Sequence, residues 1–515
     1  MTLKRIAYSP LILLGLFFVI HFFFWWSHTH SLYFEDETEH LTPAWMMIHH
    51  DRRLYSDIST NHQPIPILVS GIFLQMYPFS DLYQLITGVR LLMYGLSFLG
   101  ALVLVWRFGY SGLVTAVLLE LIKYFFFGYY LLQESLAVYP LLWVMGLVLE
   151  SFFSSKGRPT DGLLLGVGVF LAGFSLLPLA PLLLGLTGLY FYQKKVTILP
   201  GILTIFGLTC VLFLFISPIG WFRETILNNY TYFLPDYLPI SGTVDWLTVW
   251  LYPLTAWFHP ATSSGIFLIA CQLMMAVSLF LLWKKMTWPT KVGLLLVWGI
   301  LPLADIRTVN HGGMYYAGFH ALPLLAGYGC LAGFLWSRAY QISLPVIKKW
   351  LVLILVLSML GVFSHSLFFL PKGDKVLDYQ TAYSSFQRTA EVINLFRREG
   401  DRLFAGPLHG YMNILTDTGL YTRFNAHLNW VYRNPQTDID FRKLIENDSP
   451  EFIYFPKSPD NAFYQTSYET GLFDRYQQVW DTNGGFTHLY ISNFVVEQRL
   501  ESAKFTLKEF GYELR

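Results

Sequence analysis

Long apolar stretches alternate with short polar ones over the first 370 residues of the chain, and no comparable stretch follows them. A helix needs about 20 apolar residues to cross the hydrocarbon core of a bilayer. The pattern predicts a transmembrane domain at residues 1-370 and a soluble domain at residues 371-515. Lys and Arg fall in alternate loops, which favours eleven transmembrane helices with a cytoplasmic N-terminus. The predicted spans are 7-27, 84-106, 111-130, 136-153, 162-176, 178-193, 198-219, 262-283, 288-304, 314-337 and 350-370.

This orientation places the loop 28-83 and the C-terminal domain on the outer, extracytoplasmic side of the membrane. The first apolar segment, residues 7-26, has no small-residue cleavage site after it, which predicts a retained anchor. Within the loop, residues 36-50 and the apolar stretch 67-76 are predicted to be helices that lie at the membrane interface. Such helices would wall a cavity at the outer leaflet.

The C-terminal segment mixes helical and strand patterns, which predicts a small α/β domain. It contains no nucleophile motif and no phosphate-binding loop. Its role is predicted to be acceptor selection or structural support, and the sequence does not choose between them. The predicted elements are a helix near 380-398, strands near 403-405, 452-455 and 488-491, and a turn at Asn483-Gly484-Gly485.

Composition agrees with a polytopic α-helical membrane protein: 54% of residues are hydrophobic, 13% are charged, and mean hydropathy is +0.44. A net charge of +1 gives no electrostatic case for binding nucleic acid. Cys210, Cys271 and Cys330 all fall in predicted spans, so neither a disulfide framework nor a cysteine metal site is indicated.

Candidate chemistry is concentrated at the start of the first outer loop, in Glu35, Asp36, Glu37 and Glu39. One interpretation is a solvated loop or a helix start, where carboxylates oppose the helix dipole. The other is catalysis, because a carboxylate at a partly dry membrane surface has its pKa raised toward neutrality and can act as a base.

A motif follows these acids: Asp36-Glu37, Ala44, Leu54-Tyr55-Ser56-Asp57 and His62-Gln63-Pro64. It resembles the first-loop pattern of GT-C glycosyltransferases, in the bacterial branch related to protein O-mannosyltransferases and aminoarabinose transferases. Gln63 stands where that pattern has a proline. The resemblance implies a GT-C type fold and a sugar donor on a polyprenyl phosphate. It also implies a protein, lipid or glycan acceptor, reached at the outer face of the cytoplasmic membrane, with membrane lipids around the enzyme.

The resemblance also suggests roles for individual residues. Asp36 would be the base or an acid that positions the substrate, and Arg307 would bind the donor phosphate with its paired donors. An ion pair with Asp305 is the alternative for Arg307. Glu134 would be a second acid facing Asp36, unless it only reaches water from its short turn. The predicted catalytic residues are Asp36, Glu37 and Glu134, and the predicted substrate-binding residues are Tyr55, Asp57, His62, Arg307, His311 and His320.

No cofactor is predicted to be required. Asp36 and His40 would share a helical face, so a divalent metal stays an open alternative. The aromatic run from Phe125 to Tyr130 is predicted to lie near the outer membrane surface, either as a lipid-binding groove or as an interfacial belt.

The predicted function is transfer of a sugar, with inversion, from a polyprenyl-phosphate donor to an acceptor. A transporter or lipid flippase is the first alternative, but the chain shows no internal repeat and its charges are predicted to lie outside the membrane. The second alternative is an inactive relative that serves as a binding partner. The retained Asp36, Tyr55, Asp57, His62 and Arg307 argue against it.

Overall fold

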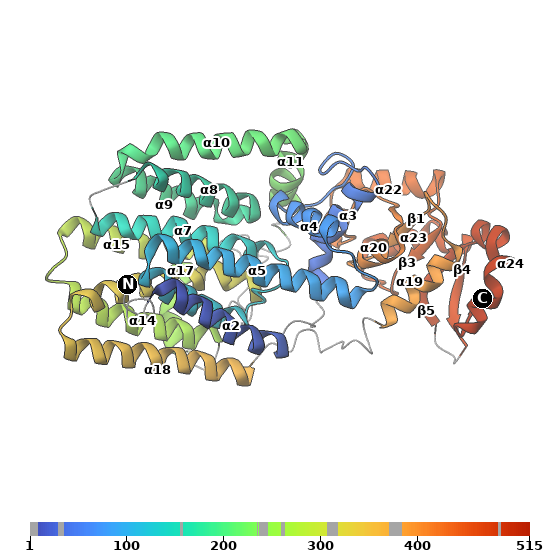
Figure 1. Cartoon of the computed structure of the whole chain (residues 1–515). Helices are drawn as coiled ribbons and strands as arrows, with labels where there is room; N and C mark the ends of the chain where they lie inside the picture. Colours follow the sequence, from blue (N-terminus) through green and yellow to red (C-terminus); the bar gives the residue numbers. More distant parts are fainter. Residues whose placement is uncertain are drawn as a thin grey trace.

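A bundle of long helices and a C-terminal α/β domain lie side by side in a computed structural model of the chain (Figure 1). The helices α3 (Thr38–His49) and α4 (Pro64–Met76) lie between these two parts. The structure describes residues 9–28, 35–154, 158–233, 235, 246–258, 263–305, 318–369, 384–482 and 486–515.

A helix of the bundle overlaps each of the eleven predicted spans. Among the described residues, six helices are long and apolar enough to cross a membrane: α2, α5, α7, α10, α14 and α18. The chain is therefore a polytopic helical membrane protein. The bundle helices are α2 (Pro10–His28), α5 (Leu82–Phe108), α6 (Tyr110–Lys123), α7 (Gln133–Phe153), α8 (Pro159–Ser175), α9 (Ala180–Gln193), α10 (Ile198–Phe215), α14 (Ser263–Leu282), α15 (Trp288–Ile300), α17 (Leu322–Ile342) and α18 (Pro345–Phe369).

The bundle buries apolar side chains inside and presents others outward. Helix α17 is buried along most of its length, with Leu325 and Tyr328 fully enclosed. On α10, by contrast, Leu203, Phe206 and Leu214 are all more than half exposed. A helix that is apolar all round and exposed fits a hydrocarbon solvent, where no polar face is needed.

A charged pair lies inside the bundle, which departs from the expectation that the charges lie outside the membrane. Glu120 and Lys123 of α6 form a fully buried ion pair of 2.9 Å. The hydroxyls of Tyr129 and Tyr139 donate to the two oxygens of Glu120, at 2.7 and 2.5 Å. These hydrogen bonds compensate for the burial of the charged pair.

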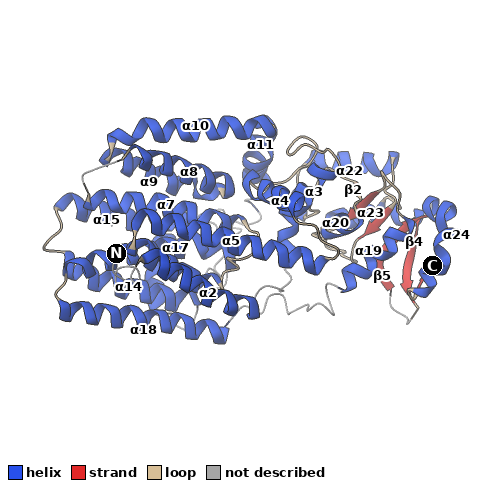
Figure 2. Cartoon of the chain, in the orientation of Figure 1, coloured by secondary structure: helices blue, strands red, loops and turns tan. Residues whose placement is uncertain are grey.

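The C-terminal domain contains a six-stranded mixed sheet in the order β2-β1-β3-β5-β4-β6 (Figure 2). The pairs β1–β2 and β1–β3 are parallel and the other three are antiparallel. The three predicted strands and the predicted helix are confirmed, and the predicted turn at 483-485 lies outside the described residues. The elements are β1 (Arg402–Ala405), β2 (Gly419–Leu420), β3 (Phe452–Tyr454), β4 (Tyr476–Asp481), β5 (Phe486–Ser492) and β6 (Tyr512–Leu514), with α19 (Ser384–Phe396), α20 (Tyr411–Thr416), α21 (Asn429–Tyr432), α22 (Pro435–Asn447), α23 (Ala462–Glu469) and α24 (Asn493–Glu509).

The first loop packs tightly against the C-terminal domain. Leu41 of α3 belongs to the same buried apolar cluster as Tyr411 and Met412 of α20. The Thr38 hydroxyl donates to the carbonyl of Leu408 at 3.1 Å. At Gly410 an added Cβ would collide with the side chain of Thr42, so this close approach needs glycine. The helices of the first loop therefore hold the C-terminal domain against the bundle.

Candidate functional site

Acidic and histidine side chains from three segments meet where the first loop reaches the bundle. We call Asp36, Glu39, His62 and Glu134 the acidic cluster. Asp36 lies in the turn η1 (Glu35–Glu37), Glu39 in the first turn of α3, and Glu134 in the first turn of α7. His62 ends the loop that enters α4, which starts at Pro64 because proline suits the first turn of a helix.

His62 is held by both of its ring nitrogens. Nε2 contacts a carboxylate oxygen of Glu39 at 2.5 Å, and Nδ1 contacts the side-chain amide of Gln133. The ring also packs edge-on against that of His40, at 4.7 Å between centroids. Burial opposes the charged form of His62, but the carboxylates of Glu39 and Asp36 outweigh it and raise its pKa above the usual value. His62 is thus easier to protonate than a free imidazole.

Asp36 is an acid of the cluster with a strongly shifted pKa. Burial raises its pKa to about 7, and the nearby carboxylates of Glu39 and Glu134 add to the shift, while His62 opposes it. Its side chain makes no hydrogen bond or ion pair with another described residue. A carboxyl group that gains and loses a proton near neutral pH suits a general base.

Glu134 faces the same space from the bundle. Its side chain is 2% exposed, and one oxygen lies 3.0 Å from Nδ1 of His320. The start of α7 favours a carboxylate because the first amide groups of a helix carry partial positive charge. Two of the predicted residues, Glu134 and His320, are therefore brought together.

Glu37 takes a supporting position, which differs from the catalytic role predicted for it. Its carboxylate forms a fully buried, two-pronged ion pair with Arg90 of α5 and also accepts from the amide of Leu131 at 2.8 Å. The Arg90 guanidinium stacks 3.4 Å above the ring of Tyr130. Because both oxygens are engaged and no part is exposed, Glu37 fixes the turn that carries Asp36.

Tyr55 and Asp57 also hold the loop in shape. Tyr55 is completely buried, so it cannot touch a ligand without moving, and its hydroxyl donates to the carbonyl of His62 at 2.7 Å. Its φ of +64° lies in the left-handed region, which gives the chain a sharp bend there. Asp57 accepts from the amide of Arg53 at 2.9 Å and binds the guanidinium of the same residue.

Two further predictions lie outside the described residues: Arg307 as the phosphate ligand, and His311 as a substrate contact. The structure groups no three His, Cys, Asp or Glu side chains at metal-binding spacing within the ranges it describes. His40, the partner suggested for Asp36 in a metal site, is 1% exposed, and burial lowers its pKa well below the usual value.

Sequence reasoning missed several residues of the site. Glu39 and Gln133 hold His62, yet neither was predicted as a site residue. Arg90, which fixes Glu37, is 53 residues away along the chain. Two signals in the sequence could have found them: the charged Arg90 near the start of the apolar α5, and the position of Gln133 directly before Glu134.

The fold and the cluster define a class: a polytopic membrane protein with a largely buried acidic cluster where its first loop meets the helical bundle, and with a C-terminal α/β domain packed on that loop. The sequence matches no protein family and no curated protein. Among solved structures, the chain is similar to the crystal structure of ArnT from Cupriavidus metallidurans bound to undecaprenyl phosphate. The match covers 86% of this chain and 92% of that chain, at 11% sequence identity and a TM-score of 0.46. The argument for function therefore rests on the residues of the cluster.

Proposed function

We propose that the chain is a membrane glycosyltransferase that moves a sugar from a polyprenyl-phosphate donor to an acceptor at the outer face of the cytoplasmic membrane. The observation that carries this proposal is Asp36, a carboxyl group whose pKa is about 7, set between Glu39, His62 and Glu134. It occupies the position that the first-loop motif gives to the base. The proposed donor class also comes from that motif.

In the proposed reaction, Asp36 accepts the proton of the acceptor hydroxyl or amine. The freed electron pair on the acceptor atom attacks the anomeric carbon from the face opposite the phosphate. The bond between that carbon and the phosphate oxygen breaks, and its electrons leave with polyprenyl phosphate. One bond forms as one breaks, so the sugar is inverted and no oxidant or reductant is needed.

The other residues would prepare this step. Glu37 and Arg90 fix the turn of Asp36, while Glu39 and Gln133 hold His62 in one orientation. His62, when protonated, would stabilise negative charge on the donor side, because a fixed positive group acts best where charge develops. Arg307 is proposed to share that task through its paired donors.

The negative charge of the cluster disfavours a nucleotide sugar as the donor. A diphosphate brings more negative charge than a monophosphate, and it usually enters with a divalent metal. A cluster of Asp36, Glu39 and Glu134 repels such a group unless a metal neutralises it. A lipid monophosphate has less negative charge to neutralise, so we propose that no metal is required.

The test is release of polyprenyl phosphate from a panel of radiolabelled polyprenyl-phosphate sugars by membranes that contain the chain. Crude cell envelope serves as the acceptor, and an EDTA-treated sample tests the metal. Wild type is expected to release the lipid phosphate from at least one donor, and Arg307→Ala is expected to lose this activity. Failure with every donor would overturn the proposal and favour transport.

A further inference from the structure

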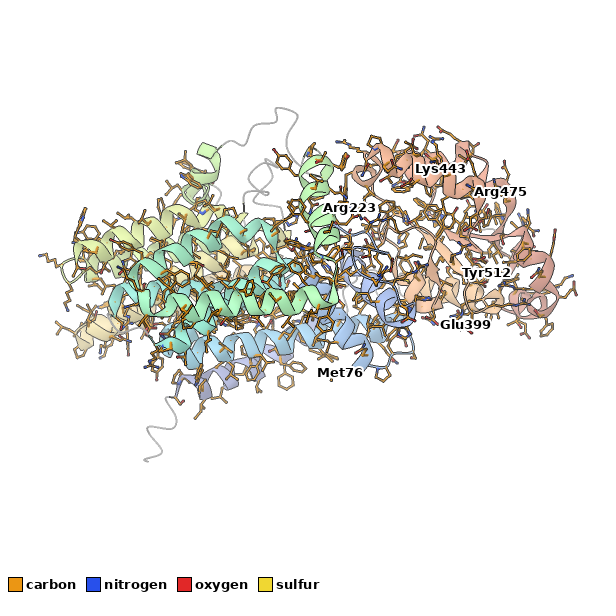
Figure 3. The ribbon with its side chains drawn as sticks, turned by 90° about the horizontal axis from the view of Figure 1, so that it is seen from above. Met76, Arg223, Glu399, Lys443, Arg475 and Tyr512 are labelled. Carbon is orange, nitrogen blue, oxygen red and sulfur yellow. The ribbon has the colours of Figure 1, made fainter. Side chains whose placement is uncertain are left out.

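A polar cavity lies between the first loop, the helical turns that follow α10, and the C-terminal domain. Its volume is about 160 Å³, whereas one ordered water needs roughly 10–15 Å³. Asn61, Glu224 and Trp430 lie on three of its sides. Arg223, another lining residue, is at the boundary between the green helical turn and the C-terminal domain in Figure 3. The space suits a ring-sized molecule rather than a single ion.

The charges that line this cavity cancel. Arg223 and Arg423 both bind one carboxylate oxygen of Glu224, at 3.0 and 2.6 Å. Asp440 supplies the second carboxylate of the lining, so two positive and two negative side chains balance. A cavity for a phosphate or an anionic lipid head group would keep an excess of positive charge. The balance favours an uncharged ligand.

Amide and hydroxyl side chains make up much of the remaining wall. An amide offers both a donor and an acceptor, which matches the hydroxyl groups of a sugar. The amide of Asn425 already donates to the carbonyl of Glu39 at 3.2 Å, and Asn434 caps the start of α22. The amide-bearing residues of the lining are Asn61, Asn228, Asn425, Asn434 and Gln436.

Aromatic rings complete the lining. Trp430 meets the ring of Phe233 edge-on, at 5.3 Å between centroids, and is only partly buried. Tyr232 and Phe424 also border the cavity. Rings beside amides supply an apolar face together with hydrogen-bonding groups. A sugar ring has the same two kinds of surface, C–H faces and a rim of hydroxyls.

The cavity lies next to the acidic cluster, because residues of its lining are bonded to residues of the cluster. Asn61 in its wall directly precedes His62, and consecutive Cα atoms are about 3.8 Å apart. Asn425 holds the backbone of Glu39, whose carboxylate binds His62. A ligand in the cavity would therefore lie next to the cluster without occupying it.

We propose that this cavity binds an uncharged saccharide unit of the acceptor and so selects a glycan over a phosphorylated or otherwise anionic acceptor. Binding of the saccharide stands on the lining alone, while its role as acceptor rests on the proposed glycosyltransferase function. Trp430 of the C-terminal domain and Asn61 of the first loop are the residues that this binding uses most directly.

The first test measures binding by calorimetry on the purified full-length chain in detergent. The probes are methyl glycosides and neutral tri- and tetrasaccharides, each paired with a uronic acid or sugar phosphate counterpart. A neutral saccharide is expected to bind about tenfold tighter than its anionic counterpart, and Trp430→Ala or Asn61→Ala is expected to weaken it about tenfold, since 1.4 kcal/mol is a factor of ten. Tyr468→Ala, exposed on α23 of the same domain, is the matched control and is expected to change nothing. Absence of saccharide binding, or tighter binding of the anionic set, would overturn the proposal.

The second test separates the cavity from the reaction. Trp430→Ala is expected to raise the KM for a bound saccharide acceptor about tenfold, whereas the exposed control Tyr468→Ala is expected to leave this KM unchanged. An unchanged KM for that acceptor would contradict the acceptor role. If wild type cleaves no donor, the glycosyltransferase function fails, and the calorimetry still decides whether the cavity binds neutral sugar.

Discussion

The carboxylate of Glu37 and the guanidinium of Arg90 form a two-pronged ion pair in which neither side chain is exposed to solvent. This pair joins the turn that carries Asp36 to helix α5, and through Leu131 to the segment that leads into α7. The site therefore depends on a charge pair that is itself outside the reaction.

Breaking this pair is expected to unfold the site. Glu37→Gln leaves the Arg90 charge buried and unpaired, which costs about 3–5 kcal/mol in comparable sites. The measurement is thermal unfolding of the purified chain in detergent. Glu37→Leu combined with Arg90→Leu removes both charges and is expected to regain most of the lost stability. Equal stability of Glu37→Gln and wild type would contradict the structural role.

The rate of transfer is expected to fall as pH falls through about 7. Asp36 acts as a base only when unprotonated, and its pKa is about 7. Glu134→Gln removes a negative charge that raises this pKa, so the midpoint of the pH–rate profile should move to lower pH. Glu399→Gln, an exposed acid labelled in Figure 3, is the control and should leave the midpoint in place. If the midpoint is the same in Glu134→Gln as in wild type, a group other than Asp36 controls the pH dependence of the rate.

Asp36 is expected to affect stability in the opposite direction: as pH rises, the rate of transfer increases while the free energy of unfolding decreases. The pKa of Asp36 is raised from 3.8 to about 7, so between these values the folded state binds more proton than the unfolded one. The free energy of unfolding therefore loses this contribution as pH rises from about 4 to 7. Asp36→Asn cannot ionise, and its unfolding free energy should fall less over this window. A variant with the same pH dependence as wild type would contradict the raised pKa.

Glu224 is expected to hold the C-terminal domain on the first loop. It accepts from the hydroxyl of Ser59 at 2.7 Å and binds Arg423 of the domain at 2.6 Å. The amide of Ser59 in turn donates to the carbonyl of Arg423 at 2.7 Å. Hydrogen bonds to a charged group contribute about 1.5–3 kcal/mol, so Glu224→Ala should speed hydrogen exchange at the Ser59 amide about tenfold or more.

The exchange experiment contains its own reference. The amide of Tyr77 at the end of α4 bonds to Phe73 within the same helix, away from this junction. Its exchange should be unchanged in Glu224→Ala. Faster exchange at both amides would indicate general loosening rather than a broken junction.

The helices were predictable because apolar length alone identifies them. The shorter α3 and α4 were predicted instead as helices at the membrane interface, from short apolar stretches within the first loop. The end of α6 was not predictable: the aromatic run after Lys123 continues the apolar pattern, yet Phe126, Tyr129 and Tyr130 turn inward and are buried. An apolar sequence alone does not show whether lipid or another helix will cover it.

The site was predictable only where the motif is local. Asp36 and His62 were recognised from residues of one loop, and the structure places both in one cluster. The pairing of Glu37 with Arg90 was not predicted, because Arg90 is on another helix and nothing near Glu37 in the chain reveals it. The strands β2, β4 and β6 were not predicted. β2 has only two residues, too few to show alternation, and in β4 the polar pair Gln477-Gln478 is followed by the apolar pair Val479-Trp480, so apolar and polar residues do not alternate.

The account depends most on Asp36 as the base, and one comparison tests that directly. The measurement is release of polyprenyl phosphate by wild type, Asp36→Asn and Glu35→Gln, each shown by thermal unfolding to be folded. Removing a positioned base typically costs about 10²–10⁴ in rate, so Asp36→Asn should fall by that factor while Glu35→Gln stays close to wild type. Folded Asp36→Asn that releases the lipid phosphate at the wild-type rate would contradict the proposed mechanism.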